Sequence, residues 1–225
     1  MTMAIDEPEE SFDDFALPEE TGDVSSPAPL SFAPWHKPRK QYVRKHQWIH
    51  HAHNTIGRLK NKGQLGDNQP LRYLTLPGPD LLDVKLMADV CAQNELNLHY
   101  TGLCYVDETD ATRLRRNTQR FEIDRGKLIT PGSDVHVSKL EDITRPRSEA
   151  KVLMERGGPY NIINIDACAP IAADSSNQTG RLVDAIRTIV EYQLENKRQA
   201  WLLYLTTPIQ TDSVSQEALA ALHEQ

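Results

Sequence analysis

The segment Leu71-Arg-Tyr-Leu-Thr-Leu-Pro-Gly-Pro-Asp-Leu-Leu-Asp83 decides the fold class. It begins as a short apolar run, turns at Pro77-Gly78-Pro79, and continues as a helix-like pattern. This order predicts a strand, a tight loop and a helix in direct succession. In an open α/β sheet such a junction lies at the carboxyl end of a strand, where these folds bind ligands.

The chain that follows alternates between predicted strands and predicted helices. We expect a helix over 80–94 with Asp80 as its N-cap, and another over 148–156 capped by Ser148. Because each parallel connection needs a crossover, the alternation predicts an α/β fold with a doubly wound, mostly parallel Rossmann-like sheet. The predicted strands are 71–76, 96–106, 133–140, 160–166 and 200–205, and the remaining helices are 110–121, 180–196 and 213–223.

Charge is distributed unevenly along the 225 residues, whose formal net charge is −7. Residues 1–23 hold nine acids and no Lys or Arg, whereas residues 24–66 hold eight Lys or Arg, five His and no acid. Residues 1–30 have too little apolar surface to offset chain entropy, so we predict a disordered acidic tail. Phe12, Phe15 and Leu17 lie within it, so the segment is interpreted either as a solubilising tail or as one that contains a short partner-binding motif.

A basic and aromatic arm, residues 31–66, precedes the α/β domain of residues 67–225. A helix is predicted over 39–61, with an apolar stripe of Tyr42, Ile49, Ala52, Ile56 and Leu59 and with most cations off that stripe. Cations interleaved with aromatic rings suit nucleic acid, because the charges meet phosphates and the rings stack on bases. The alternatives are packing on the domain, docking of a partner, or contact with the acidic tail. The candidate nucleic-acid contacts, within residues 31–62, are Lys37, Arg39, Lys40, Arg44, Lys45 and Trp48.

No metal site is predicted, and no disulfide. Three histidines share one face of the arm helix, but no Cys or acid lies nearby in sequence to complete a ligand set, so they are interpreted as a surface cluster. The three cysteines form no CxxC pair and are interpreted as buried thiols in a reducing compartment. The histidines are His46, His50 and His53, and the cysteines are Cys91, Cys104 and Cys168.

Membrane insertion and secretion are not predicted. No apolar run approaches the roughly 18–20 residues that span a bilayer, and the acidic N-terminus is unlike a signal peptide. We therefore expect a cytoplasmic or otherwise intracellular protein, and the nucleus is among the compartments open to it if its source is eukaryotic.

The order and spacing of residues 70–225 resemble those of class I S-adenosylmethionine-dependent methyltransferases. The resemblance rests on element order and on the placement of acids after strands. In that family the first strand leads into a glycine-rich loop that approaches the methionine part of the cofactor. The matching segment is Leu76-Pro77-Gly78-Pro79-Asp80, which holds one glycine, and Thr75 stands near the place of the acid that usually ends the first strand.

The resemblance also implies a set of site residues. Asp107 matches the acid that accepts hydrogen bonds from the ribose hydroxyls, the alternative being a loop acid that caps the next helix. Asp166 ends the predicted fourth strand, where amino methyltransferases hold the target nitrogen, the alternative being an ordinary strand-end acid. Asp166 is thus the candidate catalytic residue, and the implied cofactor contacts are Leu76, Pro77, Gly78, Asp80, Asp107, Glu141 and Asp142.

Two functions follow from the resemblance. One is methyl transfer from S-adenosylmethionine to an amino group of a nucleic acid or protein, with the arm recruiting the substrate. The other is a methyltransferase-like module without catalysis, acting as a binding or scaffold subunit of a larger, nucleic-acid-associated assembly. The family's sheet usually has two further strands, so a protein partner or a further segment is expected beside the apolar run 201–205. Nicotinamide dehydrogenases and P-loop nucleotidases are disfavoured, because their glycine motifs are absent.

Overall fold

The computed structural model describes residues 38–66, 69–105, 109–126, 128–168, 171 and 182–207. By its contacts the chain divides into Met1–Ala33 and Pro34–Gln225, and all described residues belong to the second unit. The predicted tail over 1–30 and the predicted helix over 213–223 lie outside the described residues. The helices are α1 (Pro38–Val43), α2 (Ile49–Asn61), α3 (Leu82–Gln93), α4 (Asp110–Gly126), α5 (Glu149–Gly157) and α6 (Leu182–Asn196), and the strands are β1 (Leu71–Thr75), β2 (Leu98–Leu103), β3 (Asp134–His136), β4 (Ile162–Asp166) and β5 (Leu202–Thr206).

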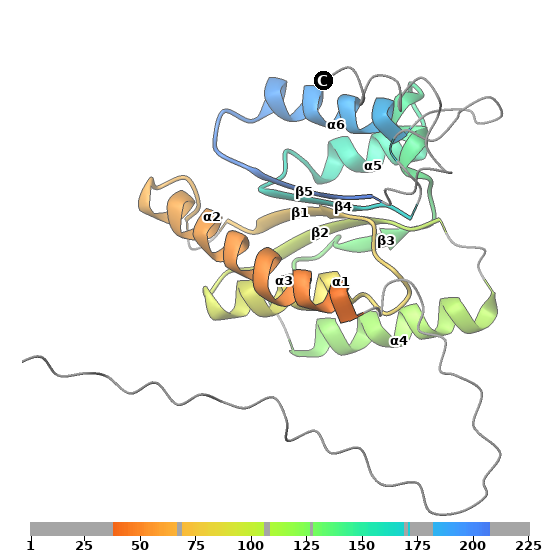
Figure 1. Cartoon of the computed structure of the whole chain (residues 1–225), viewed down its shortest axis with the longest axis horizontal. Helices are drawn as coiled ribbons and strands as arrows, with labels where there is room; N and C mark the ends of the chain where they lie inside the picture. Colours follow the sequence, from red (N-terminus) through yellow and green to blue (C-terminus); the bar gives the residue numbers. More distant parts are fainter. Residues whose placement is uncertain are drawn as a thin grey trace, which may run out of the picture. The chain divides into compact units, whose positions relative to one another are not determined.

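The described strands form one parallel sheet in the order β3-β2-β1-β4-β5 (Figure 1). The chain moves outward from β1 through β2 to β3, then crosses back to β4 and moves outward in the opposite direction. β1 and β4 are therefore neighbours at the point where the winding reverses. This is the Rossmann-like, doubly wound α/β fold predicted from the alternation of elements.

Helices cover both faces of the sheet. Figure 1 shows α5 and α6 on one face, and α2, α3 and α4 on the other. Strand side chains alternate between the faces, so that Tyr73 of β1 belongs to the core under α3 while Leu74 belongs to the core under α5 and α6. Burial on both faces explains why the central strands are nearly continuous apolar runs.

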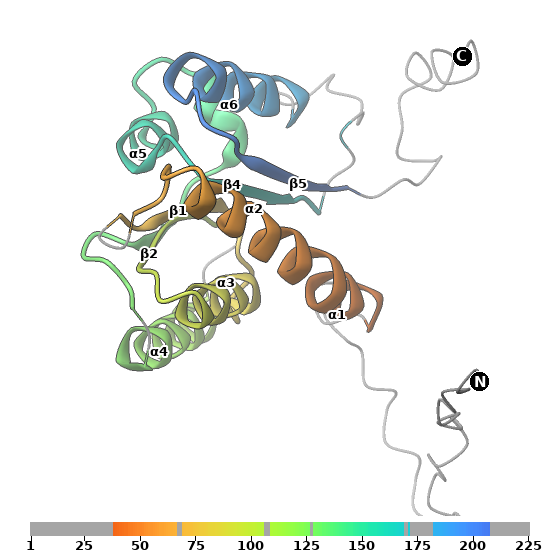
Figure 2. The ribbon, with the colours of Figure 1, turned by 90° about the vertical axis from the view of Figure 1, so that its left-hand side faces the viewer.

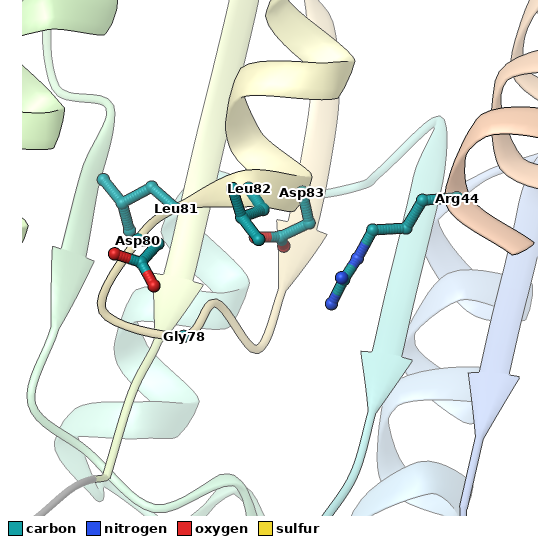
Figure 3. Close-up of a pocket in the computed structure, with 6 residues that line it drawn as sticks. All are labelled: Arg44, Gly78, Asp80, Leu81, Leu82 and Asp83. Carbon is teal, nitrogen blue, oxygen red and sulfur yellow. The ribbon is translucent and has the colours of Figure 1, made fainter. Parts of the chain in front are cut away.

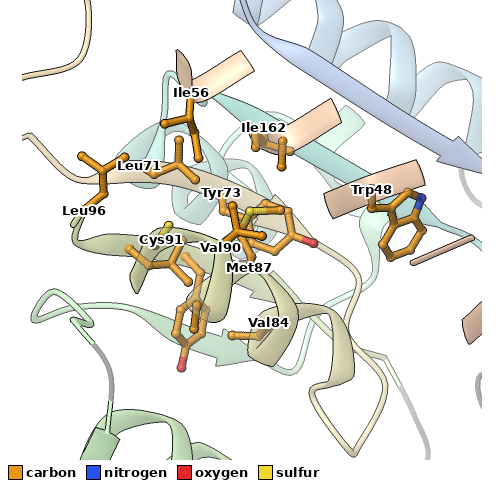
Figure 4. Close-up of a cluster of buried hydrophobic side chains, with 14 of the residues drawn as sticks. Trp48, Ile56, Leu71, Tyr73, Val84, Met87, Val90, Cys91, Leu96 and Ile162 are labelled. Carbon is orange, nitrogen blue, oxygen red and sulfur yellow. The ribbon is translucent and has the colours of Figure 1, made fainter. Parts of the chain in front are cut away.

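The arm helix α2 covers a part of the sheet that no described crossover helix reaches. α3 and α4 connect β1, β2 and β3 on their face, whereas α5 and α6 lie on the opposite face. α2 packs beside α3 on that face and crosses the strands of the β1, β4 and β5 side (Figure 2). Ile56 of α2 and Trp48, just before this helix, belong to one core with Ile162 (Figure 4), and Tyr204 belongs to the same core. The arm is thus an integral layer of the fold.

The arm helix is not α-helical throughout. Arg44–Trp48 forms a π-helical turn between α1 and α2. A π-turn holds more residues per turn than an α-helix, and such turns are frequent at functional sites. Arg44 and Trp48, at its two ends, are both buried. Tyr42, predicted on the apolar stripe, is instead 62 % exposed, whereas Ala52, Ile56 and Leu59 are buried as predicted.

Two further expectations are corrected, and one residue of an apolar strand is exposed. Leu81, at φ 49°, stands at the N-cap of α3 and no side chain caps this helix, so Asp80 is not the cap. Leu205 of β5, in the apolar run 201–205, is 42 % exposed. Cys168 is exposed, because it lies beyond the end of β4, whereas Cys91 and Cys104 are buried as predicted. The predicted cap of α5 is confirmed, since the Ser148 side chain accepts a hydrogen bond from the Lys151 N–H.

No helix within the described ranges is long and apolar enough to cross a membrane.

Candidate functional site at the carboxyl edge of β1 and β4

The loop after β1 makes a tight turn before α3. The Leu81 N–H donates a hydrogen bond of 3.0 Å to the Gly78 carbonyl oxygen, and the left-handed backbone of Leu81 redirects the chain into the helix. Asp80 is buried and forms an ion pair with Arg115 of α4. The predicted cofactor loop is therefore held from both sides, by its own turn and by the neighbouring helix.

Pro77 packs closely on β2. A Cβ added to Gly102 would lie 2.9 Å from Cγ2 of Val135 and 3.0 Å from Cγ of Pro77. Such distances are below normal carbon–carbon contact, so only glycine fits at this position. The loop thus uses its close approach for contact with its own sheet, at the place where the resembling family uses glycine to approach a ligand.

A buried polar cluster lies where β1 and β4 end. Asn164 Nδ2 donates to the Tyr73 hydroxyl at 3.1 Å and to Thr75 Oγ1 at 3.4 Å. Both hydroxyls donate hydrogen bonds to Oδ2 of Asp83. The bond from Tyr73 measures 3.4 Å, and the bond from Thr75 is shorter. Oδ1 of Asn164 is buried and accepts no hydrogen bond from the described residues. The cluster therefore leaves one acceptor at the switch point unsatisfied.

Burial controls the protonation of this cluster. Desolvation raises the pKa of Asp83, and the Thr75 hydroxyl opposes that shift by stabilising the carboxylate. Desolvation also raises the pKa of Tyr73, with a further contribution from the nearby Asp83 charge. Tyr73 is therefore a neutral hydroxyl at physiological pH.

Two cations of the arm hold Asp166 at the end of β4. Lys40 Nζ lies 2.7 Å from Asp166 Oδ1, and a terminal nitrogen of Arg44 lies 3.4 Å from Oδ2. The side chains of Arg44 and Asp166 are only 7 % and 9 % exposed. Arg44 also stands over the Trp48 ring, with its guanidinium carbon 5.6 Å from the ring centroid. The candidate catalytic carboxylate is thus engaged by the chain's own N-terminal helix.

A hollow beside the β1 loop is small and contains Arg44. Figure 3 shows Arg44 extending from the arm helix toward the start of α3. The empty volume is about 170 Å³ with open solvent included, whereas pockets for drug-sized ligands measure about 300–1,000 Å³. It has room for about one water molecule and not for a whole nucleoside cofactor. Its lining residues are Arg44, Gly78, Asp80, Leu81, Leu82 and Asp83.

The predicted site residues are only partly brought together. Gly78 and Asp80 line the hollow, Pro77 packs on β2, and Leu76 packs against the core on the α5–α6 side. Asp107 lies outside the described residues. Glu141 and Asp142 occupy a 3-10 turn, Leu140–Thr144, which Leu140 and Ile143 anchor to the core on the opposite face from Tyr73. Asp142 forms an ion pair of 3.1 Å with Arg145 in that turn.

The predicted nucleic-acid contacts divide into an inner and an outer set. Lys40 and Arg44 point to Asp166, and Trp48 is buried with its ring stacked on Tyr204 at 5.5 Å. Arg39 and Lys45 are exposed, and Lys37 lies outside the described residues. Packing accounts for the inner set, and the outer set presents charge to solvent.

Sequence reasoning missed Asp83, Tyr73 and Asn164 as site residues. Each lies inside a predicted element and there resembles an ordinary helix or strand position. The signal was the sheet register: Thr75 and Asn164 are paired residues of β1 and β4. Within the described residues no group of three or more His, Cys, Asp and Glu side chains is placed to hold a metal ion.

Comparison with protein-family models gives a match to the PP_RS20740-like family over residues 29–225. Comparisons with curated proteins and with solved structures gave no match.

Proposed function

Because this chain belongs to the PP_RS20740-like family over nearly its whole length, we propose one function for the α/β unit and its arm together. It is a methyltransferase-like Rossmann module that binds S-adenosylmethionine at the carboxyl edge of the sheet. The methyl acceptor is an amino group of a nucleic acid or a protein. The exposed arm cations Arg39 and Lys45 bring a nucleic-acid substrate to this edge, and Cys91, a buried thiol, agrees with a reducing, intracellular compartment.

The observation that carries the proposal is the buried polar cluster at the winding reversal. In open α/β sheets ligands bind outside the carboxyl ends of the strands at this point. Asp83 and Asn164 stand at that point between β1 and β4, and Asp166 lies at the end of β4. A polar cluster has a desolvation cost there that an apolar core would not have, which supports a role in binding.

The acceptor groups of the site suit the cofactor, but the space is too small while the arm is in place. Carboxylates and the unsatisfied Oδ1 of Asn164 are acceptors for hydroxyl and amino hydrogens. The hollow of about 170 Å³ is too small for the whole cofactor with Arg44 inside it. The proposal therefore requires α1 and the π-turn to move away from Asp166 before the ligand enters.

The residues of the chain would then orient the acceptor. S-adenosylmethionine, when bound, supplies a methyl group that its sulfonium has already activated, so positioning is the main task of the protein. Asp166, once Lys40 and Arg44 have left it, is a carboxylate at the edge that accepts a hydrogen bond from an amino group. Lys40 and Arg44 hold it unavailable until then.

A second candidate is a binding or scaffold module without turnover. The observation that favours it is the pair of short contacts that sequester Asp166. Removing one partner from a buried ion pair costs about 3–5 kcal/mol, so a permanently closed edge is physically reasonable. In that case β5, an edge strand of the described sheet, pairs with a protein partner that extends the sheet, and its exposed Leu205 contacts that partner.

Calorimetric titration with S-adenosylmethionine and S-adenosylhomocysteine separates the two candidates. We expect binding weaker than about 1 mM in the wild type and at least tenfold tighter binding in a Lys40→Ala/Arg44→Ala double variant. Arg39→Ala/Lys45→Ala is the matched control, since it removes two exposed cations of the same helix segment and should leave affinity unchanged. No binding by the wild type or the double variant would exclude the first candidate. Tighter binding by the wild type than by the double variant would show that the arm cations bind the ligand instead of excluding it.

A further inference from the structure

Several cations gather at the opposite, amino-terminal edge of the sheet. Arg72 lies near the start of β1 and is the register partner of His99 near the start of β2. Arg156 belongs to the last turn of α5, and Lys197 follows the last residue of α6. Four segments thus bring three cations and the His99 ring to one place, which is far from Asp83 and Asp166 along the strands.

Arg72 is the fixed centre of this group. It follows Leu71 and precedes Tyr73, both in the core under α3, so its side chain lies on the α5–α6 face. There one terminal nitrogen of Arg72 donates a hydrogen bond of 2.7 Å to the Gly157 carbonyl oxygen at the end of α5. The bond orients the guanidinium and leaves its other N–H groups available.

The group has no carboxylate partner in the described part of the chain. Arg72 makes its side-chain bond to a neutral carbonyl, and neither Arg156 nor Lys197 forms an ion pair with a described residue. Glu155, the adjacent acid of α5, lies 4.0 Å from Lys151 on its own helix. Carbonyls at a helix C-terminus attract cations, yet only Arg72 is bonded to one. Helix capping therefore accounts for one of the cations and not for the group.

Burial and the charge of Arg72 both disfavour the protonated forms of Lys197 and His99. Burial, then the Arg72 charge, lowers the pKa of Lys197 to about 8. Burial lowers the pKa of His99 as well, followed by the charges of Arg72 and Arg156. The charge of Arg72 therefore acts on both Lys197 and His99, and the charge of Arg156 acts on His99, as expected for neighbouring groups of like charge.

We propose that Arg72, His99, Arg156 and Lys197 form an oxyanion site that binds a phosphate group. The planar forks of the arginines match two oxygens of a phosphate, and the lysine supplies a point charge. His99 Nδ1 is engaged with the Thr130 hydroxyl at 2.8 Å, which leaves Nε2 for the ligand. A bound phosphate supplies the counter-charge that the described chain lacks. The site does not depend on cofactor binding at the carboxyl edge.

Two sources of phosphate share this chemistry, and the experiment has one arm for each. In the first arm, inorganic phosphate and pyrophosphate are titrated into the full chain while NMR follows the His99 ring and the Lys197 ammonium. In the second, a single-stranded oligonucleotide without terminal phosphates is titrated in the same way. We expect saturable shifts at both residues and a rise in the pKa of Lys197 when the anion binds, because protonation and anion binding favour each other.

Variants of the surrounding residues test the phosphate site while Arg72 is left unchanged. Lys197→Gln and Arg156→Gln should each weaken binding about tenfold, whereas Arg187→Gln, which removes an exposed cation of α6 outside the group, should not change it. Saturation by free phosphate only would assign the site to a small phosphorylated ligand, and saturation by the oligonucleotide would assign it to a nucleic-acid backbone. Absence of saturable shifts with both probes, or equal loss in Arg187→Gln, would overturn the proposal.

Discussion

The side chain of Gln193 in α6 pairs with the backbone of Tyr160 as a neighbouring strand would. The Tyr160 N–H donates to Gln193 Oε1 at 2.8 Å, and Gln193 Nε2 donates to the Tyr160 carbonyl oxygen at 2.9 Å. Gln193 is fully buried. It thereby satisfies two backbone groups just before β4 begins.

Replacement of Gln193 should destabilise the fold. Gln193→Leu leaves two buried backbone groups without partners, so we expect a loss of about 2–6 kcal/mol, from roughly 1–3 kcal/mol per unsatisfied group. Urea denaturation followed by circular dichroism measures the change. Leu194→Gln, at the adjacent and 67 % exposed position, is the control and should shift the midpoint little. Equal stability of Gln193→Leu and wild type would show that the pairing contributes nothing.

The same substitution at two glycines should have opposite effects. Gly102→Ala places a Cβ against Val135 and Pro77 and should destabilise the protein by about 1–3 kcal/mol. Gly57→Ala in α2 meets nothing within 4 Å and should stabilise it by about 0.5–1 kcal/mol, because alanine is the better helix former. Thermal unfolding of both variants gives the comparison. Similar destabilisation of both would contradict the close contact of the β1 loop with β2.

The raised pKa of Asp83 predicts a loss of stability as pH rises. At a pH below 3.8, the ordinary pKa of the group, Asp83 is protonated in both the folded and the unfolded chain. The free energy of unfolding then does not depend on pH through this group. Above 3.8 the unfolded chain loses the proton first, so the free energy of unfolding falls until the raised folded pKa is passed. The slope is at most about 1.4 kcal/mol per pH unit.

Asp83→Asn removes that titration and keeps an acceptor for the Thr75 hydroxyl. Denaturation at a series of pH values from about 4 to 8 should therefore show that the free energy of unfolding of the variant increases relative to that of the wild type as pH rises. Parallel curves for the two proteins would mean that Asp83 has no raised pKa in the folded state.

The Tyr204 hydroxyl ties the arm helix to β5. It donates a hydrogen bond of 2.6 Å to the Trp48 carbonyl oxygen, in the π-turn of the arm. Tyr204→Phe keeps the ring that stacks on Trp48 and should cost about 0.5–1.5 kcal/mol. Relative to the wild type, amide hydrogen exchange in the Tyr204→Phe variant should be accelerated more in α1 and the π-turn than in α3. Uniform acceleration across the unit would instead indicate that the arm opens only with global unfolding.

Nucleic-acid binding by the arm is best tested with point variants. Deletion of residues 31–62 would remove Trp48 and Ile56 from the core, so loss of binding would be uninformative. Arg39→Ala/Lys45→Ala removes exposed charge only. If both residues contact phosphates, the salt dependence of single-strand binding should fall by about 1.4 in log–log slope. An unchanged slope would exclude these two residues from the interface.

The element order was predictable because it depends on local periodicity, whereas the site depends on pairings across the chain. Ser148 was recognised as a cap, since its interaction partner is three residues away. Thr75 and Asn164 meet only because β1 and β4 are neighbours in register, 89 residues apart. No local pattern in the sequence contains that relationship.

Local patterns also failed where the backbone departs from ideal geometry. Asp80 has the residue type of an N-cap, but the left-handed Leu81 moves the start of α3 past it. Lys40 and Arg44 lie off the apolar stripe on an ideal helix, and the sequence alone placed them among candidate nucleic-acid contacts. The structure turns both toward Asp166 across a π-turn that residue spacing does not reveal.

The π-turn makes the carboxyl edge sensitive to the length of the arm. Successive residues of an α-helix differ by about 100° around the axis. Deleting one of the exposed residues 45–47 and closing the turn as α-helix would therefore rotate α1 by roughly that angle, while the packing of α2 on the core stays in place. Lys40 would then face away from Asp166. A single-codon deletion would thus convert a closed edge into an open one, whereas most single substitutions in this helix would leave it closed.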